Sequence, residues 1–377
     1  MSKILLVANT DWYLYNFRLS LIRQIKESGH IPVLISPSGP YAQKFVQAGF
    51  EHIPWQVGRQ SIAPWHELSA VQHLKEIYRQ QSPDLVHHHT HKAVLYGTMA
   101  AQRLGIPVVN SIPGRGYVYS STALKAKFLK PILEMMFQRY LQPCSKQVMI
   151  FENHDDQTYF TDKGFIPSEK AILIPSVGVD LARFDHDPAP ETNRPIAAFV
   201  GRMLWSKGVG IFAAAARLLR EKRIPCRLIL VGLPDSDHPE NIPASAIEAW
   251  VSEGILEWWG WQDDINQVYQ KINILAHPTQ YGEGVPTTLI EAAASRRAII
   301  ASDWPGCREV ITHGQTGLLI EPGDINDLAD KITTLVRNPA LRTELADHAY
   351  QLVHDHFGTQ KVNQRTLEVY GRLLSES

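Results

Sequence analysis

The sequence predicts two α/β domains, each built on a doubly wound parallel sheet. Short apolar runs rich in β-branched residues alternate along the chain with longer amphipathic stretches. Nearly continuous apolar strands separated by helices are typical of parallel sheets that are buried on both faces. A stretch rich in Asp, Pro, Glu and Asn at residues 184–195 divides these runs into two sets of six and is the predicted linker. Because ligands bind at the carboxyl ends of such strands, we expect the two domains to face each other across a cleft.

The predicted elements divide the chain into an N-terminal domain, residues 1–183, and a C-terminal domain, residues 196–357. The strands predicted in the first domain are 4–8, 33–35, 85–88, 108–111, 148–151 and 172–175. Those predicted in the second are 197–200, 228–231, 256–259, 274–277, 299–302 and 317–320. The tail is predicted to be helical from Asp324, a good helix N-cap, with a break at Gly358. We expect the last helix, residues 358–377, to return to the first domain.

The composition is that of an ordinary globular protein. Apolar residues make up 44% and charged residues 20% of the 377 residues, which excludes wholesale disorder. No apolar run approaches the ~20 residues of a membrane-spanning helix. The run at 4–8 leads directly into Asn9, Thr10 and Asp11, so it is predicted to be a strand rather than a signal peptide. The three cysteines lie far apart in sequence, which favours a reducing, cytoplasmic location.

Charge is distributed unevenly along the chain. Residues 1–150 contain 16 lysines and arginines against 7 aspartates and glutamates, whereas the remainder contains 21 against 31. Solvated helix faces would explain this, and so would a front half that faces an anionic membrane or a phosphorylated substrate. The amphipathic stretch 123–141 allows the same two interpretations, a core helix with a solvated face or an interfacial helix on anionic lipid. Its basic residues are Lys125, Lys127, Lys130 and Arg139.

These observations leave two locations open, fully cytoplasmic or peripheral on the inner face of the plasma membrane. Nucleic acid is not an expected partner, because no recognised binding module is present and the basic residues do not form a groove with stacking aromatics.

The most informative motif is a loop rich in Gly and Pro at 282–286 that opens a helix. It follows the strand predicted at 274–277, and Pro286 suits a first helical turn. Free backbone N–H groups at such a helix start, together with the helix dipole, favour a phosphate. Glu283 lies at the helix mouth and Glu291 about two turns inside an Ala-rich helix, where a carboxylate needs a polar partner such as a ribose diol. The alternative is an ordinary helix with a surface glutamate.

A second motif, residues 201–208, places two cations after the strand predicted at 197–200. Arg202 supplies a planar guanidinium that can donate two parallel hydrogen bonds, and Lys207 supplies a compact ammonium. The two are a suitable pair for a diphosphate leaving group. The residue order of a Walker phosphate loop is absent.

In this order and spacing, the two motifs resemble the donor half of glycosyltransferase family 4, whose retaining enzymes have the GT-B fold of two Rossmann-like domains. Residues 305–309 and 314–319 also resemble the family pattern. The resemblance implies an acceptor-binding first domain and a donor-binding second domain. It implies that Arg202 and Lys207 hold the donor diphosphate and that Glu283 touches the donor sugar or phosphate. The implied donor-binding set is Arg202, Lys207, Glu283, Gly284, Val285, Pro286, Thr287 and, on the ribose, Glu291.

The front half resembles a subgroup that extends polyprenyl-diphosphate-linked saccharides, often with an N-acetylhexosamine from a UDP donor. The resemblance implies a UDP-sugar co-substrate, a lipid-linked acceptor and a role in cell-surface polysaccharide or glycan assembly. A Gly-Gly loop common in the family is replaced by Asn9-Thr10-Asp11, so its diphosphate contacts are not carried over. The residues that carry the resemblance are 9–12, 15–18, 83–88, Lys92, 96–97, Gly114 and 116–118. The acceptor-side candidates are Asn16, Arg18, Gly114 and Arg115.

Four histidines within residues 87–91 raise the possibility of a zinc site. His87, His89 and His91 would share one face of a strand, but no distant Cys, His or Asp set completes a tetrahedral site. The family resemblance instead aligns His89 with a histidine near the transferred sugar, which makes it a catalytic candidate beside Arg202, Lys207 and Glu283. A packed loop histidine is the alternative for His89, and structural roles are expected for the other three.

The expected reaction is a sugar transfer with retention. No carboxylate is evident as a nucleophile, so we expect a front-face route in which protein cations stabilise the departing diphosphate. Asp235-Ser236-Asp237 matches the string of a metal-binding DxD motif, but it lies in a turn-rich loop. Because Arg202 and Lys207 already supply the counter-charge, no metal and no other cofactor is expected. A nucleotide-sugar epimerase, a nucleotide-sugar sensor and a transferase with a soluble acceptor are the alternatives.

Overall fold

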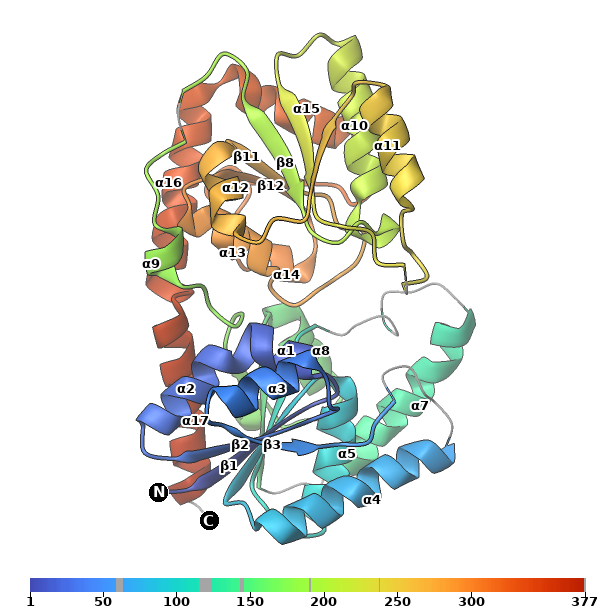
Figure 1. The fold of residues 1–377 in the computed structure, drawn as a ribbon, viewed down its shortest axis with the longest axis vertical. Coiled ribbons are helices and arrows are strands. Elements are labelled where there is room, and N and C mark those ends of the chain that lie inside the picture. The colour runs from blue at the N-terminus through green and yellow to red at the C-terminus, as the bar shows by residue number, and fades with distance from the viewer. Residues whose placement is uncertain are drawn as a thin grey trace. The chain divides into compact units, whose positions relative to one another are not determined.

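The computed structural model describes residues 1–58, 64–114, 119, 124–142, 146–189, 191–236 and 238–375. The chain divides into two compact units, Met1–Val177 with Gln360–Ser377, and Gly178–Thr359. Each unit is a parallel sheet with an apolar core and helices on both of its faces (Figure 1). The predicted α/β architecture of two doubly wound parallel sheets is therefore confirmed. No helix in the described part of the chain is both long and apolar enough to cross a membrane.

The first unit contains a seven-stranded parallel sheet in the order β3-β2-β1-β4-β5-β6-β7. One of its strands, β3, was not predicted from the sequence. Its residues Glu51 and His52 are polar and it ends in Pro54, a pattern that an edge strand tolerates but a central one does not. The strands are β1 Lys3–Ala8, β2 Ile31–Ser36, β3 Glu51–Pro54, β4 Leu85–His89, β5 Val108–Ile112, β6 Gln147–Phe151 and β7 Ala171–Leu173.

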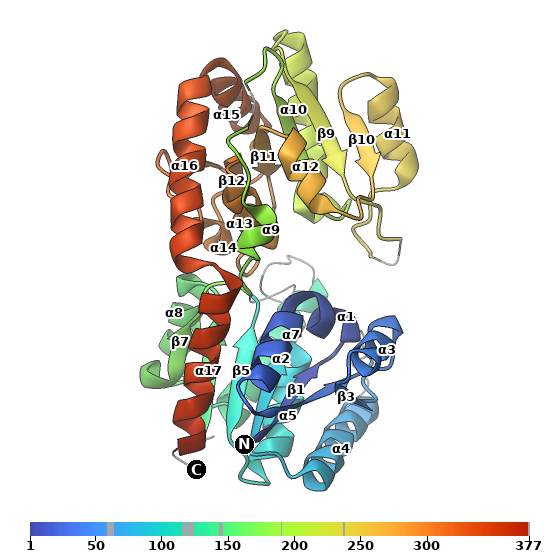
Figure 2. The same ribbon diagram turned by 60° about the vertical axis from the view of Figure 1, so that its left-hand side comes forward.

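The helices of the first unit cover both faces of this sheet. The last helix of the chain joins an apolar cluster of the first unit through Val369, Tyr370 and Leu373, and Figure 2 shows it beside the sheet. The helices are α1 Asp11–Tyr13, the π-helical η1 Leu14–Arg18, α2 Leu19–Glu27, α3 Pro40–Gln47, α4 Pro64–Gln81, α5 His91–Gln102, α7 Leu124–Tyr140, α8 His154–Asp162, η2 Ser168–Lys170 and α17 Thr359–Ser375.

The second unit contains a six-stranded parallel sheet in the order β10-β9-β8-β11-β12-β13. Its strands are β8 Ile196–Val200, β9 Arg227–Val231, β10 Glu257–Gly260, β11 Ile274–His277, β12 Ala298–Ser302 and β13 Leu318–Ile320. Its helices are α9 Leu181–Phe184, η3 Trp205–Lys207, α10 Val209–Glu221, α11 Ala244–Ser252, α12 Ile265–Lys271, α13 Thr287–Ala294, α14 Pro305–Arg308, α15 Ile325–Arg337 and α16 Pro339–His356.

The segment between the two predicted domains belongs to the second unit. The division falls at Val177, before the expected boundary at residue 183. Val179 pairs with Gly358 in an isolated parallel bridge, Phe184 is buried in the apolar core of the second unit, and Tyr350 donates a hydrogen bond to Asp185 over 3.1 Å. The stretch 184–195, expected to be a linker, is thus attached along the surface of the second unit by its own apolar and polar contacts.

The strand orders locate the two places where a ligand site is expected. In the first sheet the direction of the strand order reverses between β1 and β4, and in the second it reverses between β8 and β11. In open parallel sheets, the loops that leave the carboxyl ends of the strands at such a reversal diverge and form a crevice. The loops after β1 and β4, and those after β8 and β11, are therefore the segments to inspect.

His88 forms a buried polar link between α4, β4 and β5. Its Nε2 lies 2.9 Å from the Tyr78 hydroxyl and its Nδ1 lies 2.8 Å from Asn110 Oδ1. Helix α5 passes directly over this ring at Gly97, where a Cβ atom would lie 2.3 Å from His88 Nε2. The imidazole cannot move aside cheaply, because both of its nitrogens are already hydrogen-bonded in the core.

We expect Gly97→Ala to destabilise the protein by about 1–3 kcal/mol, the usual cost of overpacking a core. Gly371→Ala in α17 is the matched control, since no atom lies within 4 Å of its Cβ position. There the better helix propensity of alanine should stabilise the protein by up to ~1 kcal/mol. Chemical denaturation measures both effects, and equal stabilities for the two variants would contradict the contact between Gly97 and His88.

Candidate functional site

The loops after β8 and β11 contact each other at the carboxyl edge of the second sheet. Gly208 has a φ of +81°, and a Cβ atom there would lie 1.8 Å from the carbonyl oxygen of Pro278. The amide of Gln280 donates to the carbonyl oxygen of Ser206 over 2.8 Å. Only glycine permits this approach, which places the end of η3 beside the segment that follows β11.

The predicted diphosphate ligand Lys207 is paired with the predicted sugar ligand Glu283. The Lys207 ammonium contacts Glu283 Oε2, while Glu283 Oε1 accepts a hydrogen bond from the Thr279 hydroxyl over 3.1 Å. His277 Nε2 lies 3.5 Å from the same Oε1 atom, at the limit of hydrogen bonding. Burial opposes the ionisation of Glu283, but Lys207 and His277 hold the pKa of this carboxyl below its usual range. Glu283 is therefore a carboxylate with both oxygens engaged.

Arg202 lies at the exposed rim of the same loop. Its Nη1 is 3.1 Å from Asp235 Oδ2, and about half of its side chain is exposed. Asp235 is thus paired with the predicted diphosphate ligand Arg202. The other acidic residue of that string, Asp237, lies outside the described residues. Within the described part of the chain, no group of three or more His, Cys, Asp or Glu side chains could hold a metal ion.

Helix α13 opens toward this ion pair. Its first residue is Thr287, and Pro286 is its N-cap instead of part of its first turn, with no side chain capping the helix. Gly284, Val285 and Pro286 are buried. The hydroxyl of Thr288, also buried, has no hydrogen-bond partner within the described residues and was not predicted as a site residue.

The position of the α13 opening is set by α14. A Cβ atom on Gly306 would lie 1.7 Å from the carbonyl oxygen of Gly284, so α14 packs directly on the backbone of the loop. This contact gives a physical reason for a glycine within the family-like stretch 305–309, which the sequence pattern alone did not supply.

Glu291 lies just over one turn inside α13 and is bound by Tyr269. The Tyr269 hydroxyl donates to Glu291 Oε2 over 3.0 Å. Burial raises the pKa of Glu291 to about 7, against the smaller opposing effects of Tyr269 and Arg183. The carboxyl is therefore short of hydrogen-bond donors in the free protein. Tyr269, His277 and Thr279 were all missed from the sequence, where no motif connects them to the two glutamates.

In the first unit, His89 ends β4 at the carboxyl edge of the sheet. It is fully buried, and neither ring nitrogen has a hydrogen-bond partner within the described residues. Its ring centroid lies 3.9 Å from that of His87 and 5.8 Å from that of Tyr13. Burial, followed by the neighbouring His87 and Arg18, holds the pKa of His89 well below its usual value. The imidazole is neutral and has unused hydrogen-bonding capacity.

Among the acceptor-side candidates, Arg18 lies close enough to His89 to help lower the pKa of that ring. Arg18 is buried, donates to the Tyr13 hydroxyl over 3.0 Å and lies 3.6 Å from Glu152. Asn16, on the same π-helical turn, is exposed and donates to the carbonyl oxygen of Trp12 over 2.9 Å. Gly114 is buried with a φ of +82°. Arg115 lies outside the described residues.

His87 and His88 are engaged within the fold. His87 Nδ1 lies 2.6 Å from the Tyr370 hydroxyl and His87 Nε2 lies 2.7 Å from the Ser111 hydroxyl. His88 is bound as described above, and His91 is buried at the start of α5, where burial lowers its pKa to about 4. These contacts agree with the structural roles expected for His87 and His88, whereas the buried His91 Nδ1 has no hydrogen-bond partner among the described residues.

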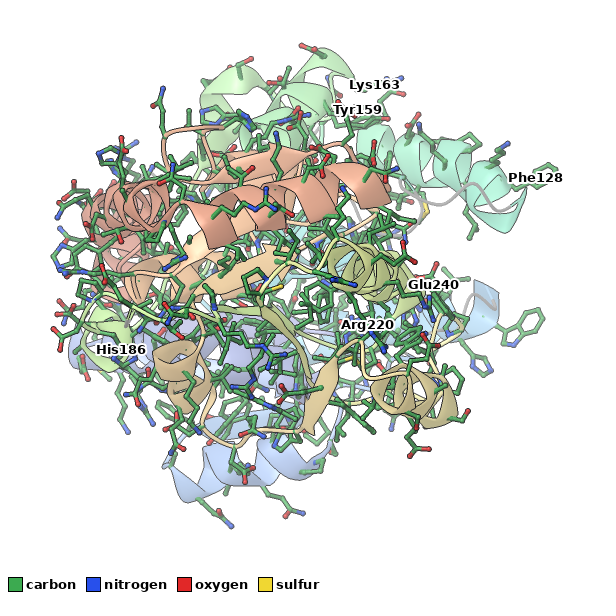
Figure 3. The ribbon with its side chains drawn as sticks, turned by 90° about the horizontal axis from the view of Figure 1, so that it is seen from above. Phe128, Tyr159, Lys163, His186, Arg220 and Glu240 are labelled. Atoms are coloured by element: carbon green, nitrogen blue, oxygen red, sulfur yellow. The ribbon has the colours of Figure 1, made fainter. Side chains whose placement is uncertain are left out.

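A cavity of about 550 Å³ in the second unit lies away from this chemistry. It is lined by Arg194, Arg227 and the C-terminal end of α10, including Arg220, which Figure 3 labels. Those residues precede or begin β8 and β9, so the cavity lies at the amino edge of the sheet. Arg227 is already bound to both carboxylate oxygens of Glu257 over 2.8 Å. We therefore place the candidate site at the carboxyl edge.

Known families match both halves of the chain. Residues 3–143 match a family described as glycosyl transferase 4-like, and residues 194–338 match one described as glycosyl transferases group 1. Among curated proteins, the chain is 27% identical over 376 residues to the N,N'-diacetylbacillosaminyl-diphospho-undecaprenol alpha-1,3-N-acetylgalactosaminyltransferase of Campylobacter jejuni, covering 96% of each. It is 24% identical to the UDP-Gal:alpha-D-GlcNAc-diphosphoundecaprenol alpha-1,3-galactosyltransferase of Escherichia coli, covering 82% of this chain and 80% of that protein.

Solved structures support the fold. A glycosyltransferase from Rickettsia africae superposes with a TM-score of 0.79 at 20% identity, covering 100% of this chain and 99% of the other. Anabaena HepE, solved in complex with UDP, gives 0.77 at 17% identity, covering 99% and 100%. A glycosyl transferase 4-like region is followed by a glycosyl transferases group 1 region in a chain with this fold. The chain therefore belongs to the two-domain glycosyltransferases and is a sugar-transferring enzyme.

Proposed function

We propose that this glycosyltransferase moves an N-acetylhexosamine from a UDP-sugar to a lipid-diphosphate-linked saccharide, with retention, in cell-surface polysaccharide or glycan assembly. The names of both curated relatives support the acceptor class, since each specifies a sugar linked to diphospho-undecaprenol. The C. jejuni name supports a hexosamine, and the E. coli name supports a UDP donor.

The observation that carries the proposal is the convergence of Lys207, Glu283 and the opening of α13 at the reversal point of the second sheet. An uncapped helix start beside a buried ammonium favours a diphosphate. In the free protein Glu283 neutralises Lys207. On this proposal the Lys207 ammonium would contact both Glu283 and a bound diphosphate. Arg202 would turn from Asp235 toward the same diphosphate. Glu291, short of donors, would accept the two ribose hydroxyl protons.

The state of Glu283 also supports a front-face route. Both of its carboxylate oxygens are engaged, by Lys207 and by Thr279, which makes it a poor nucleophile or base. In the proposed step the bond from the anomeric carbon to the diphosphate breaks while the acceptor hydroxyl bonds to the same face. The departing diphosphate takes the hydroxyl proton. Arg202, Lys207 and the α13 opening stabilise the charge that grows on the leaving group. His89, neutral and unpartnered, is assigned a hydrogen bond to the transferred sugar.

A direct assay tests this function. The purified protein is incubated with UDP-N-acetylhexosamine and a polyprenyl-diphosphate-linked saccharide, and the lipid product is analysed by mass spectrometry. The free saccharide without its lipid diphosphate is the control acceptor. Addition of one hexosamine to the lipid-linked acceptor alone is expected. Equal transfer to the free saccharide would contradict the acceptor class, and isomerised donor formed without any acceptor would identify an epimerase.

Arg202→Ala should lower kcat/KM by about 100-fold, as expected for loss of one donor to a developing oxyanion. Arg217→Ala is the matched control, because Arg217 is a similarly exposed arginine paired with a carboxylate, Glu253. Steady-state kinetics at matched thermal stability compare the two, and equal rates would remove Arg202 from the site. Lys207→Ala is a less clean test, since it leaves the largely buried Glu283 without its cation.

Glu291→Gln should weaken UDP binding and yet stabilise the protein. Because the folded-state pKa of about 7 exceeds the ordinary 4.5, the folded state holds the proton more tightly than the unfolded state does. Ionising Glu291 therefore lowers the free energy of unfolding. This loss grows as the pH rises from 4.5 to about 7 and persists at higher pH. We expect the Tm advantage of the variant to be small near pH 5 and larger near pH 8.

Calorimetry with UDP and thermal denaturation at the two pH values check this prediction. Glu344→Gln, on an exposed position of α16, is the control and should change neither measurement. Unchanged UDP affinity in Glu291→Gln would give Glu291 a structural role, whereas a Tm difference independent of pH would contradict its raised pKa.

Activity should be unaffected by excess EDTA, because protein cations face the proposed diphosphate. Asp235→Asn should remain near the wild type, since an asparagine oxygen can still accept from Arg202. Initial rates with and without chelator measure this. Loss of activity on chelation and its recovery with Mn²⁺ would overturn the diphosphate assignment.

A further inference from the structure

Helix α7 packs only one of its two apolar faces. Leu133, Met136, Phe137 and Tyr140 lie against the apolar core of the first unit, and Phe137 is fully buried there. This face accounts for the attachment of the helix to the sheet. It does not account for the remaining large apolar residues of the same helix.

The opposite face of α7 presents Phe128, Ile132 and Met135 to solvent. Their exposed fractions are 73%, 51% and 62%, and Phe128 points away from the molecule in Figure 3. Their spacing of four and three residues places them in one row along the helix. Single exposed apolar residues are ordinary, but a row of three on one helix indicates a surface that meets an apolar partner.

Basic side chains flank this row. Lys127 and Arg139 are exposed, and Lys130 is 43% exposed. The acidic Glu134 does not oppose them, because it accepts a hydrogen bond from the Tyr159 hydroxyl over 2.6 Å and lies 4.0 Å from Lys130. An apolar row bordered by cations is complementary to a surface that is anionic outside and apolar beneath, as a bilayer of acidic lipids is.

The first turn of α4 adds Trp65 and Leu68, which are 70% and 61% exposed. In Figure 1, α4 and α7 both begin at the right-hand edge of the first unit. Glu67, between these two residues, is paired with Lys92, so its charge is compensated. Tryptophan favours the boundary between headgroups and acyl chains, where its ring is buried and its N–H remains wet.

We propose that α7 docks the first unit on an anionic lipid bilayer, with Phe128, Ile132 and Met135 inserted at the headgroup boundary and Lys127 and Arg139 held at the lipid phosphates. The inference rests on the proposed function in that a lipid-linked acceptor is embedded in such a bilayer. Lys127 lies beside the first residue of the apolar row and Arg139 lies one turn beyond the last, so each end of the row carries a cation.

Co-sedimentation with vesicles tests the docking surface. Wild-type protein should bind mixed vesicles of phosphatidylglycerol and phosphatidylcholine, and should bind vesicles of pure phosphatidylcholine at least 10-fold more weakly. Its affinity for the mixed vesicles should fall as added salt shortens the electrostatic screening length from ~10 Å toward ~3 Å. The triple variant Phe128→Ser/Ile132→Ser/Met135→Ser should lower the partition coefficient at least 10-fold. Lys127→Glu/Arg139→Glu should abolish the preference for the anionic vesicles.

The control variant is Val46→Ser/Leu233→Ser/Val251→Ser, which removes three apolar residues exposed elsewhere, at 60%, 45% and 39%. It should bind vesicles as the wild type does. Equal binding of the α7 triple variant would overturn the proposal. Wild-type protein that binds neither vesicle would also overturn it and would leave the exposed face to a protein partner.

An activity measurement separates this proposal from the proposed function. On a detergent-dispersed lipid-diphosphate saccharide, the triple variant should be as active as the wild type. On the same acceptor in anionic vesicles, its rate relative to the wild type should fall by about the same factor as its vesicle partition coefficient. If neither protein acts on the dispersed acceptor, the proposed function fails while the vesicle result still decides the docking surface.

Discussion

The ion pair between Lys207 and Glu283 is the interaction on which the candidate donor site depends. Lys207 ends the short helix η3 after β8, and Glu283 lies in the loop after β11, so the pair ties together the two loops at the reversal point of the sheet. Both side chains are largely buried, where either charge alone would be strongly unfavourable. The pair holds a cation in a largely buried place at the proposed diphosphate site, and the Thr279 hydroxyl donates to the second carboxylate oxygen.

Two close backbone approaches make this pairing possible. Gly208 lies against the Pro278 carbonyl and Gly306 lies against the Gly284 carbonyl, so neither position has room for a side chain. The first approach brings η3 to the loop after β11, and the second presses α14 onto the opening of α13. On the proposed function, Lys207 and the opening of α13 are thereby held in place before a ligand binds, which is the condition for efficient electrostatic stabilisation.

In the first unit, one strand gives three neighbouring histidines different roles. Successive residues of a strand point to opposite faces, so His88 is bound by Tyr78 and Asn110 while His87 is bound by Tyr370 and Ser111. Of these three, it is His89, at the carboxyl end of β4, whose two ring nitrogens both lack a partner among the described residues. Its place at the strand end, where the sheet reverses, distinguishes it from its neighbours.

The sequence by itself determined the α/β architecture and the loops that carry the proposed donor residues, because both are local signals. Short, nearly continuous apolar runs predict buried parallel strands. The cations and glutamates lie in the loops that directly follow such runs in the sequence. The tertiary structure alone decided that Asp235 partners Arg202, that Tyr269 holds Glu291, and that β3 joins the sheet edge. It alone decided that one apolar face of α7 is packed and that the face with Phe128 is exposed. These facts depend on contacts between segments far apart in the chain, and an amphipathic pattern does not specify which of two apolar faces meets the core.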